Sequence, residues 1–397
     1  MDSDRVAAKL EVLVLNQIAP LGLQQLPADR YTVVRESRAP DVILVRSREL
    51  HGYEFGARLM AVGRAGAGVN NIPVAELSAR GVPVFNAPGA NANAVKELVL
   101  AGMLMGARNL APALDFVGRL DPAASDLARR VEDGKKQFAG GELPGHTLGV
   151  IGLGRIGSLV ADAAIRLGMN VLGYDPEITV DAAWSLPSQV RRARSIDEVL
   201  KSSHFVTLHV PLLRQTRHIV NAGNVGQLRP GAILLNFARE GVVDDEAVLA
   251  ALRDGRLKSY VTDFPTSVLL GQPGVVALPH LGASTGEAEE NSAVMVVKQV
   301  RDYLEHGNLR NAVNFPDASM DRESHYRLAI ANANVPDMLA RISHVLGSRK
   351  LNIHNMLNKS KADMAYTLVD VDSTVPPETI EQLRRIDGVL AVRYLPR

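Results

Sequence analysis

Short apolar runs alternate with segments of helical period from Leu10 to Leu304. An apolar run followed by an amphipathic helix is the repeating unit of a parallel α/β sheet. The pattern therefore predicts an α/β protein with parallel sheets. The predicted strands are Leu10–Leu15, Tyr31–Val34, Val42–Val45, Leu59–Gly63, Val82–Phe85, Leu148–Ile151, Asn170–Tyr174, His204–Val210, Ala232–Phe237, Ser259–Thr262 and Val275–Leu278.

Two long helices are predicted, one before and one after the middle of the chain. The helix over Ala92–Arg108 has small residues on one side, which allow close helix contact within the chain or across a dimer. Residues 111–140 are charged and irregular, as in a helix followed by a surface excursion. The long amphipathic helix over Glu287–Leu304 could return the chain to the first domain, and Asn308–Asp321 has the composition of a linker.

The last 70 or so residues have a different hydrophobic pattern, which predicts the order strand, helix, strand, strand, helix, strand. This order is the ferredoxin-like βαββαβ arrangement, which predicts a small third domain. The strands are Tyr326–Ala331, Leu351–Lys359, Met364–Asp372 and Val389–Leu395, and the helices are Val335–Ser348 and Pro376–Ile386.

Composition narrows the classes of function. The 397 residues have a formal net charge of +1, which gives no reason to expect nucleic acid or an anionic membrane as partner. No stretch is apolar enough for a membrane span, and the start of the chain lacks the pattern of a signal peptide. The chain contains no cysteine, which excludes disulfides and thiolate metal sites and fits the cytoplasm. We expect no metal site.

The stretch Leu148–Asp175 carries a dinucleotide fingerprint in its full context. A strand leads into Gly152, Gly154 and Gly157, a helix follows, and a second strand ends on Asp175. The glycines allow a tight turn, backbone approach to a pyrophosphate and close helix packing, and the helix N-terminus attracts the anion. Because Asp175 would accept ribose hydroxyls and repel a 2′-phosphate, NAD is the predicted cofactor.

Polar residues follow the predicted strands, and ligands of parallel sheets bind beyond these carboxyl ends. Hydride transfer to NAD requires the protein to hold a substrate and to move a proton. Arg239 offers a guanidinium fork for a carboxylate, and His280 can take a hydroxyl proton because its ordinary pKa lies near neutrality. Asp263 could orient this histidine or contact the nicotinamide amide.

These residues resemble the D-isomer-specific 2-hydroxyacid dehydrogenases, over about residues 40–395. The resemblance rests on Leu148–Gly157, His209–Pro211, Asn236–Arg239 and Pro279–His280. It implies two Rossmann-like, doubly wound domains: a discontinuous substrate domain (1–95 with 285–315) and an NAD-binding domain (96–284). The third domain, 325–397, is similar to ACT regulatory domains.

The resemblance also assigns roles to single residues. His280 would be the acid/base, Arg239 the carboxylate ligand and Asp263 a further residue of the catalytic site. The substrate would be a small phosphorylated 2-hydroxyacid, held by Arg46, Ser47, Arg64, Gly66, Ala67, Gly68, Asn91 and Lys96. Cofactor contacts would come from Gly152, Gly154, Arg155, Ile156, Gly157, Asp175, His209, Val210, Pro211, Ala238, Asp263, Gly282 and Ala283. Asn332, Asn334 and Asn352 would contact an amino-acid effector such as serine.

Three departures from the family pattern are visible. The family has a glutamate a few residues after the position of Asp263, where this chain has Ser267, so Asp263, Glu240 or no carboxylate would assist His280. Lys96 stands where alanine is usual, either as a substrate ligand or as an exposed helix residue. Asp337 follows Pro336 where the ACT pattern has glycine, which weakens the expectation of serine binding.

Two other readings remain open. The chain could act on another D-2-hydroxyacid, with Arg46 and Arg64 structural, or it could be an NAD-sensing scaffold like the C-terminal-binding-protein corepressors. Either way we expect a homodimer or homotetramer.

Overall fold

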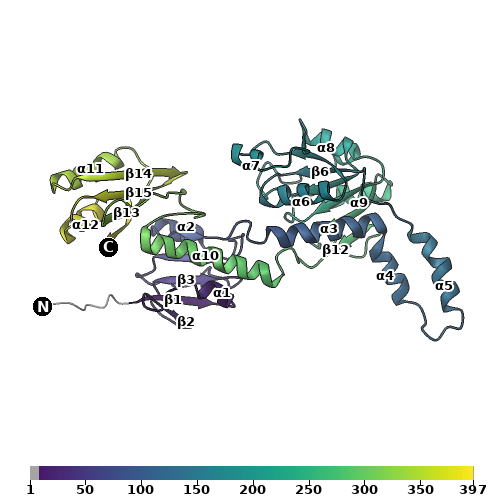
Figure 1. Ribbon diagram of the computed structural model, residues 1–397, viewed down its shortest axis with the longest axis horizontal. Helices are drawn as coiled ribbons and strands as arrows, with labels where there is room; N and C mark the ends of the chain where they lie inside the picture. The colour runs from purple at the N-terminus through teal and green to yellow at the C-terminus, as the bar shows by residue number, and fades with distance from the viewer. Residues whose placement is uncertain (1–8, 397) are drawn as a thin grey trace. The chain divides into compact units, whose positions relative to one another are not determined.

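The computed structural model describes residues 9–396, which form two compact units (Figure 1). Unit 1 comprises the described residues of Met1–Ala90 and Gly286–Arg397, and unit 2 is Asn91–Thr285. Residues 1–8 of the predicted substrate domain and residue 397 of the predicted ACT-like domain lie outside the described residues. The three-domain boundaries given by the resemblance stay a prediction.

The first sheet of unit 1 is parallel and has the strand order β2-β1-β3-β4-β5. Its order is that of a flavodoxin-like sheet, in which the strand order reverses between β1 and β3. Helix α10 (Gly286–His306) returns the chain to this unit, as predicted, and packs so closely on α1 (Pro20–Leu23) that a Cβ at Gly22 would lie 2.6 Å from that of Ala293. The other elements are β1 (Leu10–Leu15), β2 (Tyr31–Val34), β3 (Val42–Val45), β4 (Ala61–Arg64), α2 (Val74–Ala79) and β5 (Val84–Phe85).

The second sheet of unit 1 confirms the predicted βαββαβ order. Its four strands are antiparallel in the order β14-β15-β13-β16. The elements are β13 (Tyr326–Ala333), α11 (Met338–Ser348), β14 (Ile353–Lys361), β15 (Met364–Val371), α12 (Pro377–Arg384) and β16 (Val389–Pro396).

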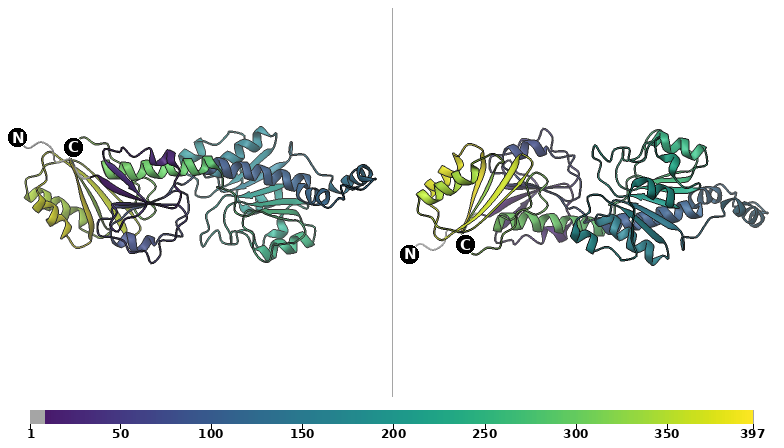
Figure 2. Two further views of the ribbon diagram at one scale, coloured as in Figure 1. Left: turned by 90° about the horizontal axis from the view of Figure 1, so that it is seen from below. Right: turned by 90° about the horizontal axis from the view of Figure 1, so that it is seen from above.

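The central strands β13 and β15 of this antiparallel sheet are buried on both faces. Leu328 and Ile330 of β13 point into a core shared with α11 and α12, which lie on one face of the sheet (Figure 2). The alternate residues Ala329 and Ala331 join the core that contains β1, β3 and α10. Because side chains of a strand alternate between faces, one strand serves two cores. This antiparallel sheet, which stands where an ACT-like domain is predicted, and the first sheet therefore share one hydrophobic core.

Unit 2 contains a seven-stranded parallel sheet with the order β12-β11-β10-β9-β6-β7-β8. This is the Rossmann order with one additional strand, and the strand order reverses between β6 and β9. The elements around it are β6 (Thr147–Ile151), α6 (Arg155–Arg166), β7 (Asn170–Tyr174), α7 (Val180–Trp184), β8 (Arg191–Arg192), α8 (Ile196–Ser202), β9 (Phe205–Leu208), β10 (Ala232–Asn236), α9 (Asp245–Arg253), β11 (Leu257–Thr262) and β12 (Val275–Ala277).

The small-residue side of α3 (Ala92–Arg108) packs inside unit 2. A Cβ at Gly102 would lie 2.8 Å from the ring of Phe237, and one at Gly106 would lie 3.0 Å from Ile233. Of the two contacts that the sequence left open, the one within the chain is present. The following α4 (Leu110–Gly118) and α5 (Leu127–Gly134) extend from the unit and contain no buried residue (Figure 1). Within residues 9–396 no helix has the length and hydropathy that crossing a membrane requires.

Candidate active site

The turn between β6 and α6 leaves its backbone open to a ligand. Gly152 has a φ of 92°, and a Cβ at Gly157 would overlap the carbonyl oxygen of Gly152, so the local fold itself requires both glycines. Gly154, at the N-cap of α6, faces open space, with no atom within 4 Å of a Cβ built there. Exposed N–H groups and a helix N-terminus at such a turn suit the pyrophosphate of a dinucleotide.

Asp175 is held beside this glycine turn. Its Oδ2 accepts the N–H of Leu153 at 2.8 Å and its Oδ1 accepts the N–H of Glu177 at 3.0 Å. An ionised carboxylate has about four acceptor positions, so two remain for the hydroxyls of a ribose. The structure therefore brings the predicted acid and the predicted glycine turn together.

His209 follows β9, the strand beside β6 where the strand order reverses. Its Nε2 lies 3.0 Å from Oγ1 of Thr207, while its buried Nδ1 has no hydrogen-bond partner within residues 9–396. Burial lowers the pKa of His209 to about 3, so the ring is neutral at pH 7. An unpaired buried nitrogen at this point of the sheet fits a polar ligand such as the predicted cofactor.

Asn236 positions the backbone that carries Arg239. It is the last residue of β10, it is 2% exposed, and its side chain accepts the Ala238 N–H at 3.1 Å and donates to the Arg239 carbonyl at 3.0 Å. The Arg239 side chain is exposed, and its Nη1 donates to the Ala238 carbonyl at 2.6 Å. The fork that was predicted to bind a carboxylate thus stands on a rigid strand end.

Asp263 holds the loop that carries His280. Its two carboxylate oxygens accept the backbone N–H groups of Leu281 and Gly282 at 2.7 and 2.8 Å. Burial raises the pKa of Asp263, and the two backbone donors and the nearby His280 act in the opposite direction.

His280 itself has a left-handed φ of 57°, and its ring lies against Phe264 with centroids 4.9 Å apart. Within residues 9–396 no carboxylate is hydrogen-bonded to the His280 ring. Asp263 therefore holds the His280 loop through its backbone.

In unit 1 the two predicted phosphate ligands stand on neighbouring strands. Arg64 ends β4 and pairs in register with Val45, the last residue of β3, which Arg46 follows. Nε of Arg64 donates to the Arg46 carbonyl at 3.1 Å, and the guanidinium lies so close to Gly66 that a Cβ there would overlap it. Nη1 of Arg46 forms an ion pair with Oε1 of Glu289 in α10 at 2.7 Å.

Asn86 anchors the loop Gly66–Gly68. Its Nδ2 donates to the Ala67 carbonyl at 2.5 Å, and the next residue, Ala87, donates its N–H to the Gly66 carbonyl at 2.9 Å. Sequence reasoning did not assign a role to Asn86, Asn236 or Glu289. Asn86 follows a predicted strand and Asn236 lies one residue before the end of another, positions that could have singled them out, whereas the pairing of Glu289 with Arg46 depends on the fold.

The other predicted substrate residues are Asn91, Lys96 and Ser47. Asn91 is the N-cap residue of α3, although its side chain makes no capping hydrogen bond. Nζ of Lys96 donates to Oδ1 of Asn93 at 2.6 Å and lies 3.7 Å from Glu97. Ser47 is exposed. Both readings of Lys96 therefore stay open.

The structure separates the three predicted effector residues within one chain. Asn332 and Asn334 lie at the end of the sheet where Ala333 pairs with Met364. Asn352 precedes Ile353, which pairs with Val371 at the opposite end. The remaining predicted cofactor residues Arg155, Ile156, Val210, Pro211, Ala238, Gly282 and Ala283 all belong to unit 2.

Comparison with known proteins identifies the class. Residues 110–282 match the model of the D-isomer specific 2-hydroxyacid dehydrogenase NAD binding domain. The chain is 34% identical over 354 residues to the D-3-phosphoglycerate dehydrogenase of Haemophilus influenzae, covering 86% of this chain and 82% of that protein. This chain belongs to the D-isomer-specific 2-hydroxyacid dehydrogenase family, and it is an NAD-dependent dehydrogenase.

Two further relatives support the assignment. The D-3-phosphoglycerate dehydrogenase of Methanocaldococcus jannaschii is 37% identical over 293 residues, which cover 71% of this chain. The match spans only about half, 53%, of that relative's length. The crystal structure of the TT0316 protein from Thermus thermophilus is 27% identical with a TM-score of 0.61, over 77% of this chain and all of that one.

Proposed function

We propose that this chain oxidises D-3-phosphoglycerate to 3-phosphohydroxypyruvate with NAD, the first step of the phosphorylated route to L-serine. The observation that carries the proposal is the arginine pair of unit 1. Arg46 and Arg64 lie at the ends of adjacent strands beside a glycine loop, an arrangement that suits a phosphate. The relatives named D-3-phosphoglycerate dehydrogenase support the same substrate.

Each residue has a defined task in this reaction. Arg46 and Arg64 neutralise the phosphate, while Arg239 and the N–H groups of Ala67 and Gly68 bind the carboxylate; the Gly66 N–H already donates to the Arg64 carbonyl at 2.9 Å. His280 takes the proton of the C2 hydroxyl group, and Asp263 keeps the His280 loop in place. The bound NAD supplies the hydride acceptor.

A turnover assay with D-3-phosphoglycerate and NAD tests the proposal, with D-glycerate as the substrate that lacks the phosphate. We expect Arg239→Ala to lower kcat/KM by about two orders of magnitude or more. His280→Ala should abolish the pH-dependent step. Equal turnover of both substrates would instead indicate another D-2-hydroxyacid, and tight NADH binding without turnover would indicate a sensing scaffold.

We also propose that the protein is a cytoplasmic homodimer or homotetramer with an amino-acid effector such as serine. The absence of cysteine supports the location. The exposed apolar residues of α4 support self-association. Buried Oδ1 of Asn332, which has no hydrogen-bond partner within residues 9–396, supports a polar ligand at the ACT-like sheet.

A further inference from the structure

A cavity of about 530 Å³ lies in unit 1, where the β14–β15 hairpin of the ACT-like sheet approaches the segment after α10. A volume of this size suits a small molecule. The walls come from three parts of the chain: Asn86 and Pro88, residues 311–313 with Pro316 and Asp317, and residues 359–361. None of these residues belongs to the predicted cofactor or effector sites.

The walls of the cavity carry an excess of positive charge. The lining contains two lysines, Lys359 and Lys361, and one acid, Asp317. Oδ1 of Asp317 already accepts the Asn311 N–H at 2.7 Å. Nζ of Lys361 is held by the carbonyls of Ala312 and Val313 at 3.3 and 3.0 Å. Lys359 is exposed and has no ion pair within residues 9–396. A fixed lysine, an unpaired lysine and neutral amides favour an anionic ligand.

The hairpin that carries both lysines is fixed at its turn. Asn334 donates its backbone N–H to the Asp363 carbonyl at 2.8 Å and its Nδ2 to the Ala362 carbonyl at 2.9 Å. Ala362 has a left-handed φ of 49°, as a tight turn requires. The wall of the cavity is therefore held in place before any ligand binds.

Asn86 connects the cavity with the loop Gly66–Gly68. It lines the cavity, its N–H bonds to the Asn311 carbonyl at 3.4 Å, and its side chain holds the Ala67 carbonyl at 2.5 Å. A ligand that competes for the Asn86 amide would loosen the loop that we propose binds the substrate carboxylate. Asn86 thus links the cavity directly to the loop Gly66–Gly68.

We propose that this cavity is an effector site for small multivalent anions that carry carboxylate or phosphate groups, with Lys359 and Lys361 as ligands. Binding itself does not depend on the proposed function. Its effect, a weaker affinity for D-3-phosphoglycerate, rests on that function. Citrate and inorganic phosphate serve as separate probes, because they distinguish a carboxylate from a phosphate preference.

Isothermal titration of the full chain measures binding. Lys359→Gln should raise the Kd of the preferred anion by about tenfold, because one charge-assisted contact is lost. Lys298→Gln, which removes an exposed lysine of α10 in the same unit, should leave the Kd unchanged. In steady-state assays the anion should raise KM of the wild type by about threefold, and Lys359→Gln should abolish this rise.

Three results would overturn the proposal. One is the absence of binding by both anions at millimolar concentration. A second is binding that survives Lys359→Gln and disappears in Arg46→Gln, which would place the anion at the arginine pair. The third is binding without any change of KM, which would remove the effector role. A chain that binds the anion through Lys359 but turns over no D-3-phosphoglycerate would contradict the proposed function alone.

Discussion

At the scale of single residues, Arg46 has a carboxylate partner before any substrate arrives. Its Nη1 lies 2.7 Å from Oε1 of Glu289, and the side chains of Arg46 and Glu289 are 32% and 40% exposed. A substrate phosphate must displace or share this carboxylate, and partly exposed ion pairs contribute only about 0.2–1 kcal/mol. We expect Glu289→Gln to lower KM for D-3-phosphoglycerate by about two- to fivefold without changing kcat.

The exposed neighbour Glu290 supplies the control for this experiment, since Glu290→Gln removes the same charge outside the ion pair. KM for D-glycerate should not respond to either change. If Glu289→Gln raises KM for the phosphorylated substrate, Glu289 positions Arg46 for the substrate and does not compete with it. Steady-state kinetics at constant ionic strength measures both cases.

His209 makes stability depend on pH. Burial lowers its pKa to about 3 from an ordinary 6.5, so the unfolded chain takes up a proton between these values and the folded chain does not. The contribution of the neutral ring is therefore complete above pH 6.5 and is lost as the pH falls toward 3. At pH 5, about 1.5 pH units below 6.5, the folded state loses about 2 kcal/mol.

Urea unfolding at pH 7 and pH 5 checks this expectation. His209→Gln keeps a hydrogen-bonding group near Thr207 but does not titrate, so the difference between the two pH values should shrink by about 2 kcal/mol. Identical differences for the variant and the wild type would show that other groups cause the loss.

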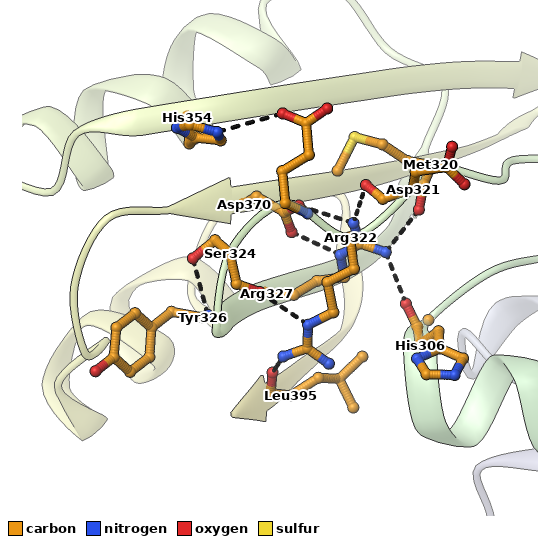
Figure 3. A network of polar contacts seen from close by, with 12 residues as sticks. His306, Met320, Asp321, Arg322, Ser324, Tyr326, Arg327, His354, Asp370 and Leu395 are labelled. Atoms are coloured by element: carbon orange, nitrogen blue, oxygen red, sulfur yellow. Dashed lines mark hydrogen bonds and ion pairs between the residues drawn. The ribbon is translucent and has the colours of Figure 1, made fainter. Parts of the chain in front are cut away.

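At the scale of elements, one buried ion pair joins β13 and β15 to the chain that follows α10 (Figure 3). Arg327 and Asp370 are 0% exposed, with Nε and Oδ1 2.6 Å apart and Nη2 and Oδ2 2.8 Å apart. The same guanidinium donates to the carbonyls of His306, Met320 and Asp321 at 3.1, 2.9 and 2.9 Å. The five guanidinium contacts therefore join β13 to β15, to the last residue of α10 and to the segment that leads from α10 to the sheet.

Arg327→Met should lower the free energy of unfolding of unit 1 by about 3–5 kcal/mol, because it leaves a buried carboxylate unpaired. Arg327→Met with Asp370→Leu should recover only part of this loss, since three carbonyls still lack their donor. Urea unfolding followed by circular dichroism measures both variants. Full recovery in the double variant would show that the carbonyl contacts contribute nothing.

The elements also show what the sequence could predict. Regular periodicity predicts the strands and places the glycine turn, Asp175, Arg239 and Asp263 after them, where the structure has them as well. Their roles in the site stay predictions. Periodicity could not show that Ala329 and Ala331 face a second core, because small apolar residues fit either a solvent-facing or a buried strand face.

The sequence pattern cannot predict contacts between distant segments either. The role of Asn86 depends on the Ala67 carbonyl, and that of Glu289 on Arg46, which lies more than two hundred residues earlier. No local pattern reports such pairs. Among the described residues, 9–396, no carboxylate is hydrogen-bonded to the His280 ring, and the sequence shows Ser267 where the family has a glutamate.

At the scale of the whole molecule, α4 offers a surface for self-association. Leu110, Leu114 and Val117 recur at helical spacing and are 40%, 69% and 56% exposed. An exposed apolar stripe of this kind is typical of an interface between protein chains.

We expect Leu114→Asp with Val117→Asp to reduce the molar mass of the native protein toward that of one 42.7 kDa chain. Light scattering after size-exclusion chromatography measures this, with Leu270→Asp, at a 61% exposed position outside α4, as the control. An unchanged oligomer in the α4 variant at low micromolar concentration would exclude this helix as the contact.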